Sequence, residues 1–292
     1  MKIETQSPIW TKSFMSISMT QLMVFTVFYA LLTTLPLYVI HGLQGSGADG
    51  GLVITVMTVA AILIRLVSAK ILEITGKRRG LILCAVAFAV TTVIYIGMWS
   101  LLPLLVLRFI HGLSFGLITT ATGAIAAIVV PKERHGEGIG YFAMSGNIAV
   151  VVGPFIGLTL LQYSSFQTLF IILSIMSLGI VLFAALVQVP MEKEEETEPK
   201  KQKLSLHDFI ETKAIPVSFI AALLTIAYAS IMTFVSVYSE AIGLLEAASY
   251  FFFVYAVAML ISRPYFGKRF DRLGSNYAII PGFLFFAVGL TM

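Results

Sequence analysis

The stretch SRPYFGKRFDRLG, residues 262–274, carries four basic side chains and one acid between two long apolar runs. The chain reads IRLVSAKILEITG at residues 64–76, which lie 198 positions earlier. Four charged or glycine positions correspond at this offset: Arg263 with Arg65, Lys268 with Lys70, Asp271 with Glu73, and Gly274 with Gly76. A pattern that recurs at a fixed offset, each time at the end of an apolar segment, indicates an internal repeat.

The composition predicts that lipid surrounds much of this chain. Hydrophobic residues make up 58% of it, charged residues 12%, and the mean hydropathy is +0.95. A soluble domain has about a quarter of charged residues. Because this much apolar surface exceeds what a single core could cover, we predict an integral membrane protein.

The composition also excludes several functions. The formal net charge of +4 is small, and no block of acids or bases indicates a nucleic-acid partner. Cys84 is the single cysteine, which excludes an intramolecular disulfide and a cysteine-based metal cluster. No segment has the spacing of metal ligands or the context of a hydrolase site, so we expect no metal, no cofactor and no enzymatic activity.

Eight apolar runs reach the length of about 20 residues that a helix needs to cross a bilayer. They cover roughly residues 14–40, 50–72, 81–98, 101–130, 138–161, 166–189, 214–241 and 247–267, and a ninth begins near Tyr277. Only helices and closed barrels satisfy their backbone in lipid, and runs this long without alternation are typical of helices. The fold class we predict is therefore all-α.

Lysine and arginine predict the orientation of these spans. Sixteen of the nineteen lie at the amino terminus or in the even-numbered connections, and the first, third, fifth and seventh connections have none. This asymmetry indicates a cytoplasmic amino terminus at residues 1–13. A six-helix bundle then covers 14–189, a charged cytoplasmic linker 190–213, and an incomplete second bundle 214–292.

The repeated loop resembles a motif of the major facilitator superfamily, Gly-x-x-x-Asp-Arg-x-Gly-Arg-Arg, which follows the second helix and recurs more weakly after the eighth. The second copy here fits at four positions, Gly267, Asp271, Arg272 and Gly274. The first copy agrees at Gly76, Lys77 and Arg78 but has Ala69, Glu73 and Ile74 at the other motif positions. The resemblance implies twelve helices in two related halves, of which this chain would hold the first six and about three more.

The resemblance also implies a role for the two acids, as latches at the cytoplasmic face. A carboxylate at a helix amino terminus gains about 0.3–1 kcal/mol from the free N–H groups and the helix dipole. Glu73 would meet the start of the eleventh helix, and Asp271 the start of the fifth near Gly138 to Tyr141. Arg65 and Arg263 could join this network. The alternative is that these charges only keep the loops in the cytoplasm.

The fourth run contains LRFIHGLSFG, residues 107–116, which resembles the family's pattern around a buried arginine. Arg108 lies roughly 8 Å beyond Pro103 at 1.5 Å per residue, and His111 follows one turn later on the same face. An arginine in the membrane must face protein or a wet cavity. Arg108 and His111 are therefore candidates for handling substrate or protons; the alternative for Arg108 is structural bonding to carbonyls of the first helix.

Gly153, Pro154 and Gly157 in the fifth run resemble a motif found mainly in the family's exporters, although Ala149 and Leu158 replace two usual glycines. The proline bends the helix and the glycines permit close packing. The preceding loop, residues 131–142, resembles that of a bacterial subgroup of efflux permeases. Both features favour export.

The family's plan places the substrate cavity among helices 1, 4, 7 and 10. The pathway candidates outside the fourth run are Tyr29, Thr33, Tyr228, Thr233 and Glu240. Since no acid lies in the middle of a span, proton coupling would use Glu240, His111 or an acid in helices not present here.

The resulting hypothesis is a secondary active transporter of the plasma membrane that exports a small organic molecule by alternating access. We expect proton coupling, a monomer in the lipid bilayer, and a whole protein of about 390–400 residues, judged from the repeat. An uptake transporter of the same fold is the first alternative. A non-transporting membrane scaffold or an inactive fragment is the second.

Overall fold

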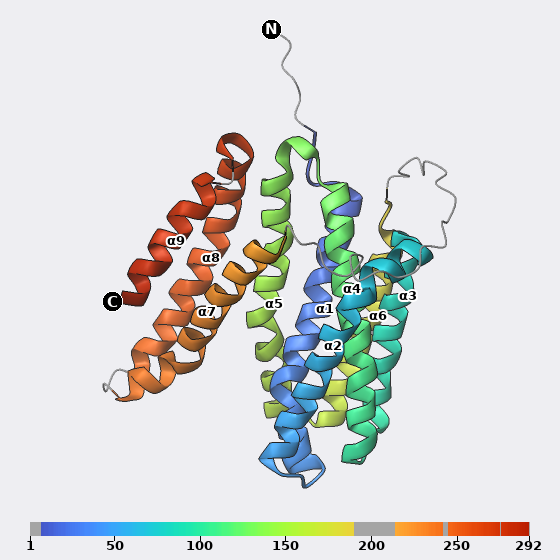
Figure 1. Ribbon diagram of the computed structural model, residues 1–292. Helices are drawn as coiled ribbons and strands as arrows, with labels where there is room; N and C mark the ends of the chain where they lie inside the picture. Colours follow the sequence, from blue (N-terminus) through green and yellow to red (C-terminus); the bar gives the residue numbers. More distant parts are fainter. Residues whose placement is uncertain (1–6, 190–213, 242–244, 275, 292) are drawn as a thin grey trace. The chain divides into compact units, whose positions relative to one another are not determined.

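The computed structural model describes residues 7–189, 214–241, 245–274 and 276–291 (Figure 1). All regular secondary structure in these ranges is helical. The α-helices are α1 (Lys12–Leu37), α2 (Gly47–Thr75), α3 (Lys77–Ile94), α4 (Leu101–Val129), α5 (His135–Tyr163), α6 (Phe166–Leu186), α7 (Ile215–Ala241), α8 (Leu245–Leu273) and α9 (Asn276–Thr291). The all-α fold predicted from the sequence is confirmed, and the proposed linker 190–213 lies outside the described residues.

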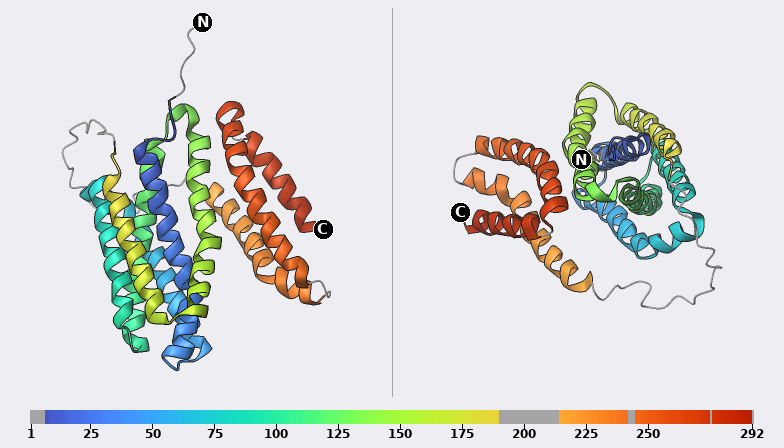
Figure 2. Two further views of the ribbon diagram at one scale, coloured as in Figure 1. Left: turned by 180° about the vertical axis from the view of Figure 1, so that it is seen from behind. Right: turned by 90° about the horizontal axis from the view of Figure 1, so that it is seen from above.

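The chain forms two compact units, one of residues 1–190 with 262–292 and one of residues 191–261. In the first unit, α1 packs against α4, α5 and α6, and α4 packs against α2 and α3. The view from above in Figure 2 shows α1 and α4 in the middle of the bundle, with α2, α3, α5 and α6 around them. The second unit contains α7 and the first part of α8.

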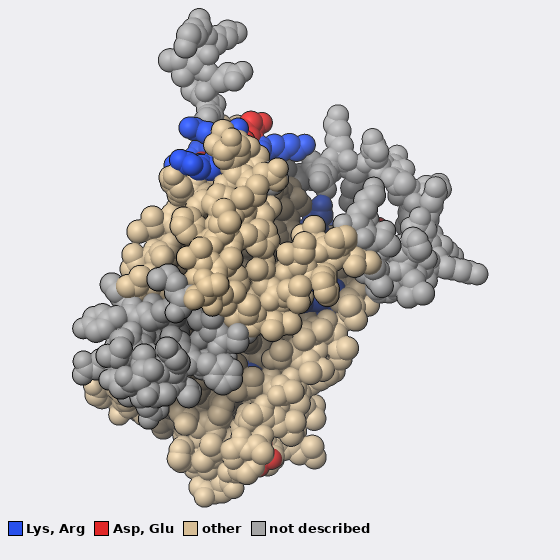
Figure 3. Space-filling model, turned by 60° about the vertical axis from the view of Figure 1, so that its left-hand side comes forward, with Lys and Arg blue, Asp and Glu red and all other residues tan. Residues whose placement is uncertain are grey.

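Six helices are long and apolar enough to cross a membrane, counted over the described residues alone. They correspond to the first six predicted spans. Large apolar side chains on their outer faces are exposed, among them Leu66, Phe155 and Leu182. On the face drawn in Figure 3, lysine and arginine side chains gather at one end, and most of the remaining described surface is uncharged. This distribution suits a bundle that lies in lipid.

The start of α2 shows why the helix begins where it does. Ser46 is the N-cap, and its hydroxyl accepts a hydrogen bond from the Asp49 N–H at 3.2 Å. The Asp49 carboxylate in turn accepts from the Ser46 N–H at 2.8 Å. This reciprocal capping box satisfies backbone donors that a helix start otherwise leaves free.

The repeated glycines both have a positive φ. Gly76 follows α2 with φ of 78°, and Gly274 follows α8 with φ of 86°. Side-chain-bearing residues rarely adopt positive φ, whereas glycine does so without a steric penalty. The repeat thus preserves the point at which each helix stops and the chain turns, which places the charged loop at the same end of both helices.

Candidate functional site

The first turn of α5 is built to receive an anion. A short 3₁₀ turn, Lys132–Arg134, leads into α5, which begins at His135 without a side-chain N-cap. The backbone N–H groups of a helix's first turn have no partners within the helix, and they carry the positive end of the helix dipole.

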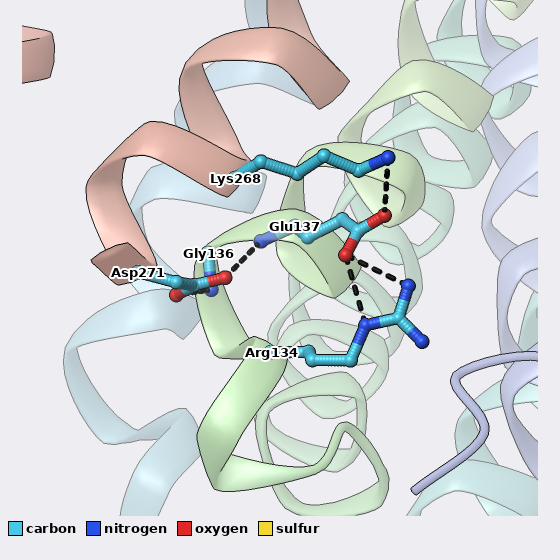
Figure 4. A network of polar contacts seen from close by, with 5 residues as sticks. All are labelled: Arg134, Gly136, Glu137, Lys268 and Asp271. Atoms are coloured by element: carbon cyan, nitrogen blue, oxygen red, sulfur yellow. Dashed lines mark hydrogen bonds and ion pairs between the residues drawn. The ribbon is translucent and has the colours of Figure 1, made fainter. Parts of the chain in front are cut away.

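Asp271 in the last turn of α8 binds this helix start. Its Oδ1 accepts a hydrogen bond from the Gly136 N–H at 2.6 Å, and its Oδ2 accepts from the Glu137 N–H at 2.9 Å (Figure 4). Both carboxylate oxygens therefore accept a hydrogen bond. The residues joined in this way are separated by 135 positions for Gly136 and by 134 positions for Glu137. Hydrogen bonds to a charged acceptor are about twice as strong as neutral ones.

Glu137 lies beside these bonds and holds two cations. Its carboxylate is 2.8 Å from Nη2 of Arg134 and 3.2 Å from Nζ of Lys268. The Glu137 side chain is 6% exposed, so its charge needs these partners. Arg134 belongs to the turn before α5 and Lys268 to α8, as Figure 4 shows. We call Arg134, Gly136, Glu137, Lys268 and Asp271 the α5–α8 clasp.

Two glycines let the helices approach closely enough for these bonds. An ideal Cβ on Gly267 would lie 2.5 Å from the carbonyl oxygen of Gly136. A Cβ on Gly136 would in turn lie 2.8 Å from the Gly267 oxygen. Both distances are shorter than a real Cβ atom adopts to a backbone oxygen. The backbones of α5 and α8 therefore touch directly at these two glycines.

A small polar pocket of about 170 Å³ opens at the clasp. Three acids and three bases line it: Glu133, Arg134, Glu137, Lys268, Asp271 and Arg272. Arg272, a predicted motif residue, therefore lies beside the clasp. The pocket lining therefore carries balanced charge.

The structure corrects the predicted position of the Asp271 contact and part of its network. Asp271 binds Gly136 and Glu137, not the Gly138–Tyr141 segment, because α5 begins three residues earlier than the apolar run suggested. Arg65 points elsewhere, with Nη2 3.4 Å from the Thr119 hydroxyl. Glu137 was missed by sequence reasoning.

The first copy of the motif makes different contacts. Glu73 is 3.1 Å from Nζ of Lys70, and both side chains are exposed. Arg78 donates from Nε to the Val187 carbonyl at 3.0 Å and so ties the start of α3 to the end of α6. Lys77 begins α3 directly after Gly76. The expected contact of Glu73 with an eleventh helix is not seen among the described residues.

Arg108 and His111 face α2 and α3, and both are completely buried. Arg108 donates from Nε to the Val53 carbonyl of α2 at 3.1 Å and from Nη1 to the Tyr95 hydroxyl at 3.3 Å. His111 Nδ1 is 2.9 Å from the same hydroxyl. The structural alternative for Arg108 expected bonding to carbonyls of the first helix. The carbonyl that binds Arg108 belongs instead to the second helix.

The glycines of the export-type motif pack α5 against α1. A Cβ on Gly153 would lie 2.8 Å from the Thr26 carbonyl oxygen, and one on Gly157 would lie 2.9 Å from Cγ2 of Thr34. Pro154 stands inside α5 between them. This arrangement is the close helix packing that the spacing predicts.

The remaining pathway candidates lie on α1 and α7. The Thr33 hydroxyl bonds to carbonyls of its own helix, at 3.0 Å for Ala30. The Tyr29 ring contacts those of Phe25 and Phe28. Tyr228 accepts a hydrogen bond from the Tyr255 hydroxyl at 3.0 Å. The side chains of Thr233 and Glu240 lie outside the described residues.

Comparison with known proteins agrees with this fold. The profile of the Major Facilitator Superfamily matches residues 17–292. The uncharacterized MFS-type transporter MJ1560 of Methanocaldococcus jannaschii is 23% identical over 224 residues, which are 75% of this chain and 58% of that protein. The multidrug resistance protein MdtG of Escherichia coli is 27% identical over 223 residues, 72% of this chain and 53% of that protein.

A solved structure shares the fold. The crystal structure of the human organic anion transporter MFSD10 matches with a TM-score of 0.53 at 17% identity, over 63% of this chain and 49% of that one. The chain spans little more than half the length of MJ1560 and MdtG. With the profile matching nearly its whole length, the chain belongs to the Major Facilitator Superfamily.

Proposed function

We propose that this protein is a secondary active transporter that exports a small organic molecule by alternating access, driven by protons. The observation that carries the proposal is the pair of hydrogen bonds that the start of α5 donates to the Asp271 carboxylate. Alternating access needs contacts at one membrane face that hold one state and can break as a unit. The clasp joins distant parts of the sequence through hydrogen bonds and ion pairs, which water can replace.

The strength of the clasp suits such a switch. Hydrogen bonds to a charged group contribute about 1.5–3 kcal/mol each. Two of them, reduced by the partial exposure of Asp271, give a bias of a few kcal/mol. A bias of that size holds one of two conformations and can be overcome by the binding of a ligand. The rest of the clasp, at Glu137, would act in the same direction.

Several features support the finer parts of the proposal. The positive-inside pattern supports a cytoplasmic clasp, a cytoplasmic amino terminus and insertion in the plasma membrane. The packing of Gly153 and Gly157 on α1, and the similarity to a protein named for multidrug resistance, support export. For protons, His111 and Glu240 are the candidate carriers, and we propose that the transporter acts as a monomer.

An efflux assay tests this function. Cells that express the protein are loaded with ethidium or with carboxyfluorescein, and the loss of fluorescence is followed with and without a protonophore. We expect faster loss than in control cells, and we expect the protonophore to abolish the difference. Accumulation of a dye would support the uptake alternative. No change with either dye, with the protein present in the membrane, would contradict transport of such molecules and favour the scaffold.

A further inference from the structure

The Tyr95 hydroxyl lies between two completely buried polar side chains. Tyr95 stands in the 3₁₀ turn that ends α3 and is 1% exposed. Its oxygen is 3.3 Å from Nη1 of Arg108 and 2.9 Å from Nδ1 of His111. Neither the superfamily motifs nor the relatives' names assign a role to this tyrosine.

The chemistry of the three groups fixes the direction of both hydrogen bonds. A guanidinium has only donors, so Arg108 donates and the Tyr95 oxygen accepts. The single hydroxyl proton of Tyr95 then needs another acceptor. His111 Nδ1 supplies one if it carries no proton. In the opposite tautomer Nδ1 would carry its own proton, and the buried Tyr95 proton would have no acceptor among the described contacts.

We propose that Tyr95 is a positioning residue that holds neutral His111 in the tautomer protonated at Nε2. His111 then presents an N–H donor on the side of its ring away from Tyr95. That nitrogen has no hydrogen-bond partner among the described residues. A group that binds it is therefore an acceptor, such as the oxygen of a carbonyl, a carboxylate or a hydroxyl. The inference goes beyond the proposed function and does not depend on it.

The surroundings hold the chain of bonds in this order. Arg108 is anchored by the Val53 carbonyl at 3.1 Å and cannot turn freely away from Tyr95. The Phe88 ring lies 4.4 Å from the His111 ring, which opposes a flip of the imidazole. Gly112 brings α4 against α2, since a Cβ there would lie 2.4 Å from the Met57 carbonyl oxygen. Packing and hydrogen bonding therefore favour the same arrangement.

Nitrogen NMR of the protein with ¹⁵N-labelled histidine tests the inference directly. The chain has four histidines, and the signals that disappear in His111→Asn identify those of His111. At a pH at which the His111 imidazole is neutral, we expect one protonated and one unprotonated ring nitrogen, with the proton on Nε2. A proton on Nδ1 would overturn the inference.

Tyr95→Phe separates positioning from packing, because it keeps the ring and removes only the hydroxyl. We expect the His111 signals to move toward an average of the two tautomers. In Tyr38→Phe, which removes a hydroxyl bonded to the Met98 carbonyl, and in Arg108→Lys, which keeps a donor-only cation, they should stay in place. Unchanged signals in a folded Tyr95→Phe protein would contradict the role of Tyr95.

Should Tyr95→Phe fail to fold, Arg108→Gln tests the same point. A glutamine oxygen can accept a hydrogen bond, so the hydroxyl proton of Tyr95 would be free to turn away from His111. We expect the proportion of the Nε2–H tautomer to fall. If that proportion equals the wild-type one, the direction of the bonds does not come from Arg108 and the inference fails.

Discussion

At the scale of single residues, Glu137 is the acid on which the charges of the clasp depend. It is nearly buried between Arg134 and Lys268. We expect Glu137→Gln to lower stability by about 1–3 kcal/mol, because two cations lose their counter-charge. Thermal unfolding in detergent measures this as a melting point several degrees lower. Glu133→Gln, the same change at an exposed neighbour, should leave it nearly unchanged; equal losses would contradict the role of Glu137.

The repeated glycine makes a second prediction at this scale. Gly76 has a φ of 78° and a ψ of 137°, a combination that costs a side-chain-bearing residue about 1–3 kcal/mol. Gly76→Ala should lower stability by that amount. Gly51 is the control, because it lies within α2, the helix that Gly76 ends, and has open space around it. Since alanine favours a helix more than glycine does, Gly51→Ala should raise stability by up to about 1 kcal/mol. Melting curves that shift in the same direction would count against this explanation of the repeat.

The sequence allowed some of these residues to be predicted and not others. Asp271 and the two glycines could be predicted because each recurs at the 198-residue offset with a physical reason for its residue type. Glu137 and Tyr95 could not, because their partners depend on how helices pack. Lys268 is 131 positions from Glu137, and no local pattern relates the two.

At the scale of helices, close contact between backbones positions the clasp. Gly267→Ala would place a Cβ against the Gly136 carbonyl, with no flexible side chain to move aside. We expect the end of α8 to separate from α5, with a stability loss of about 1–3 kcal/mol. Gly146→Ala, in open space on α5, is the matched control and should be neutral or slightly stabilising. If both variants melt alike, the close approach is not needed.

Helix boundaries were predictable to within a few residues, but helix faces were not. The apolar runs predicted each α-helix of the described residues, since lipid requires long unbroken spans. The apolar run begins at residue 138, three residues after the start of α5, because the first turn of this helix contains the polar side chains of His135 and Glu137. The sequence did not predict which neighbouring helices Arg108 faces. The packing of α4 against α2 and α3 determines its partners.

At the scale of the whole molecule, the proposed orientation can be measured with single cysteines. The native Cys84 is buried and gives little background. Gly47→Cys, at the exposed first residue of α2, should react with a membrane-impermeant maleimide in intact cells. Arg79→Cys, exposed at the start of α3, should react only after the cells are opened. The reverse pattern would mean that the positive-inside pattern does not set the orientation of this protein.

The central claim is that the Asp271 carboxylate holds the cytoplasmic face closed. Ala143→Cys, about one turn beyond Gly140 on α5, reports opening through its rate of maleimide labelling from the cytoplasmic side. In this background we predict that Asp271→Asn raises the rate several-fold, because the amide loses the charge and turns a donor toward two N–H groups. Asp49→Asn, the same change at the start of α2, should have no effect. Equal rates in the two variants would contradict the claim.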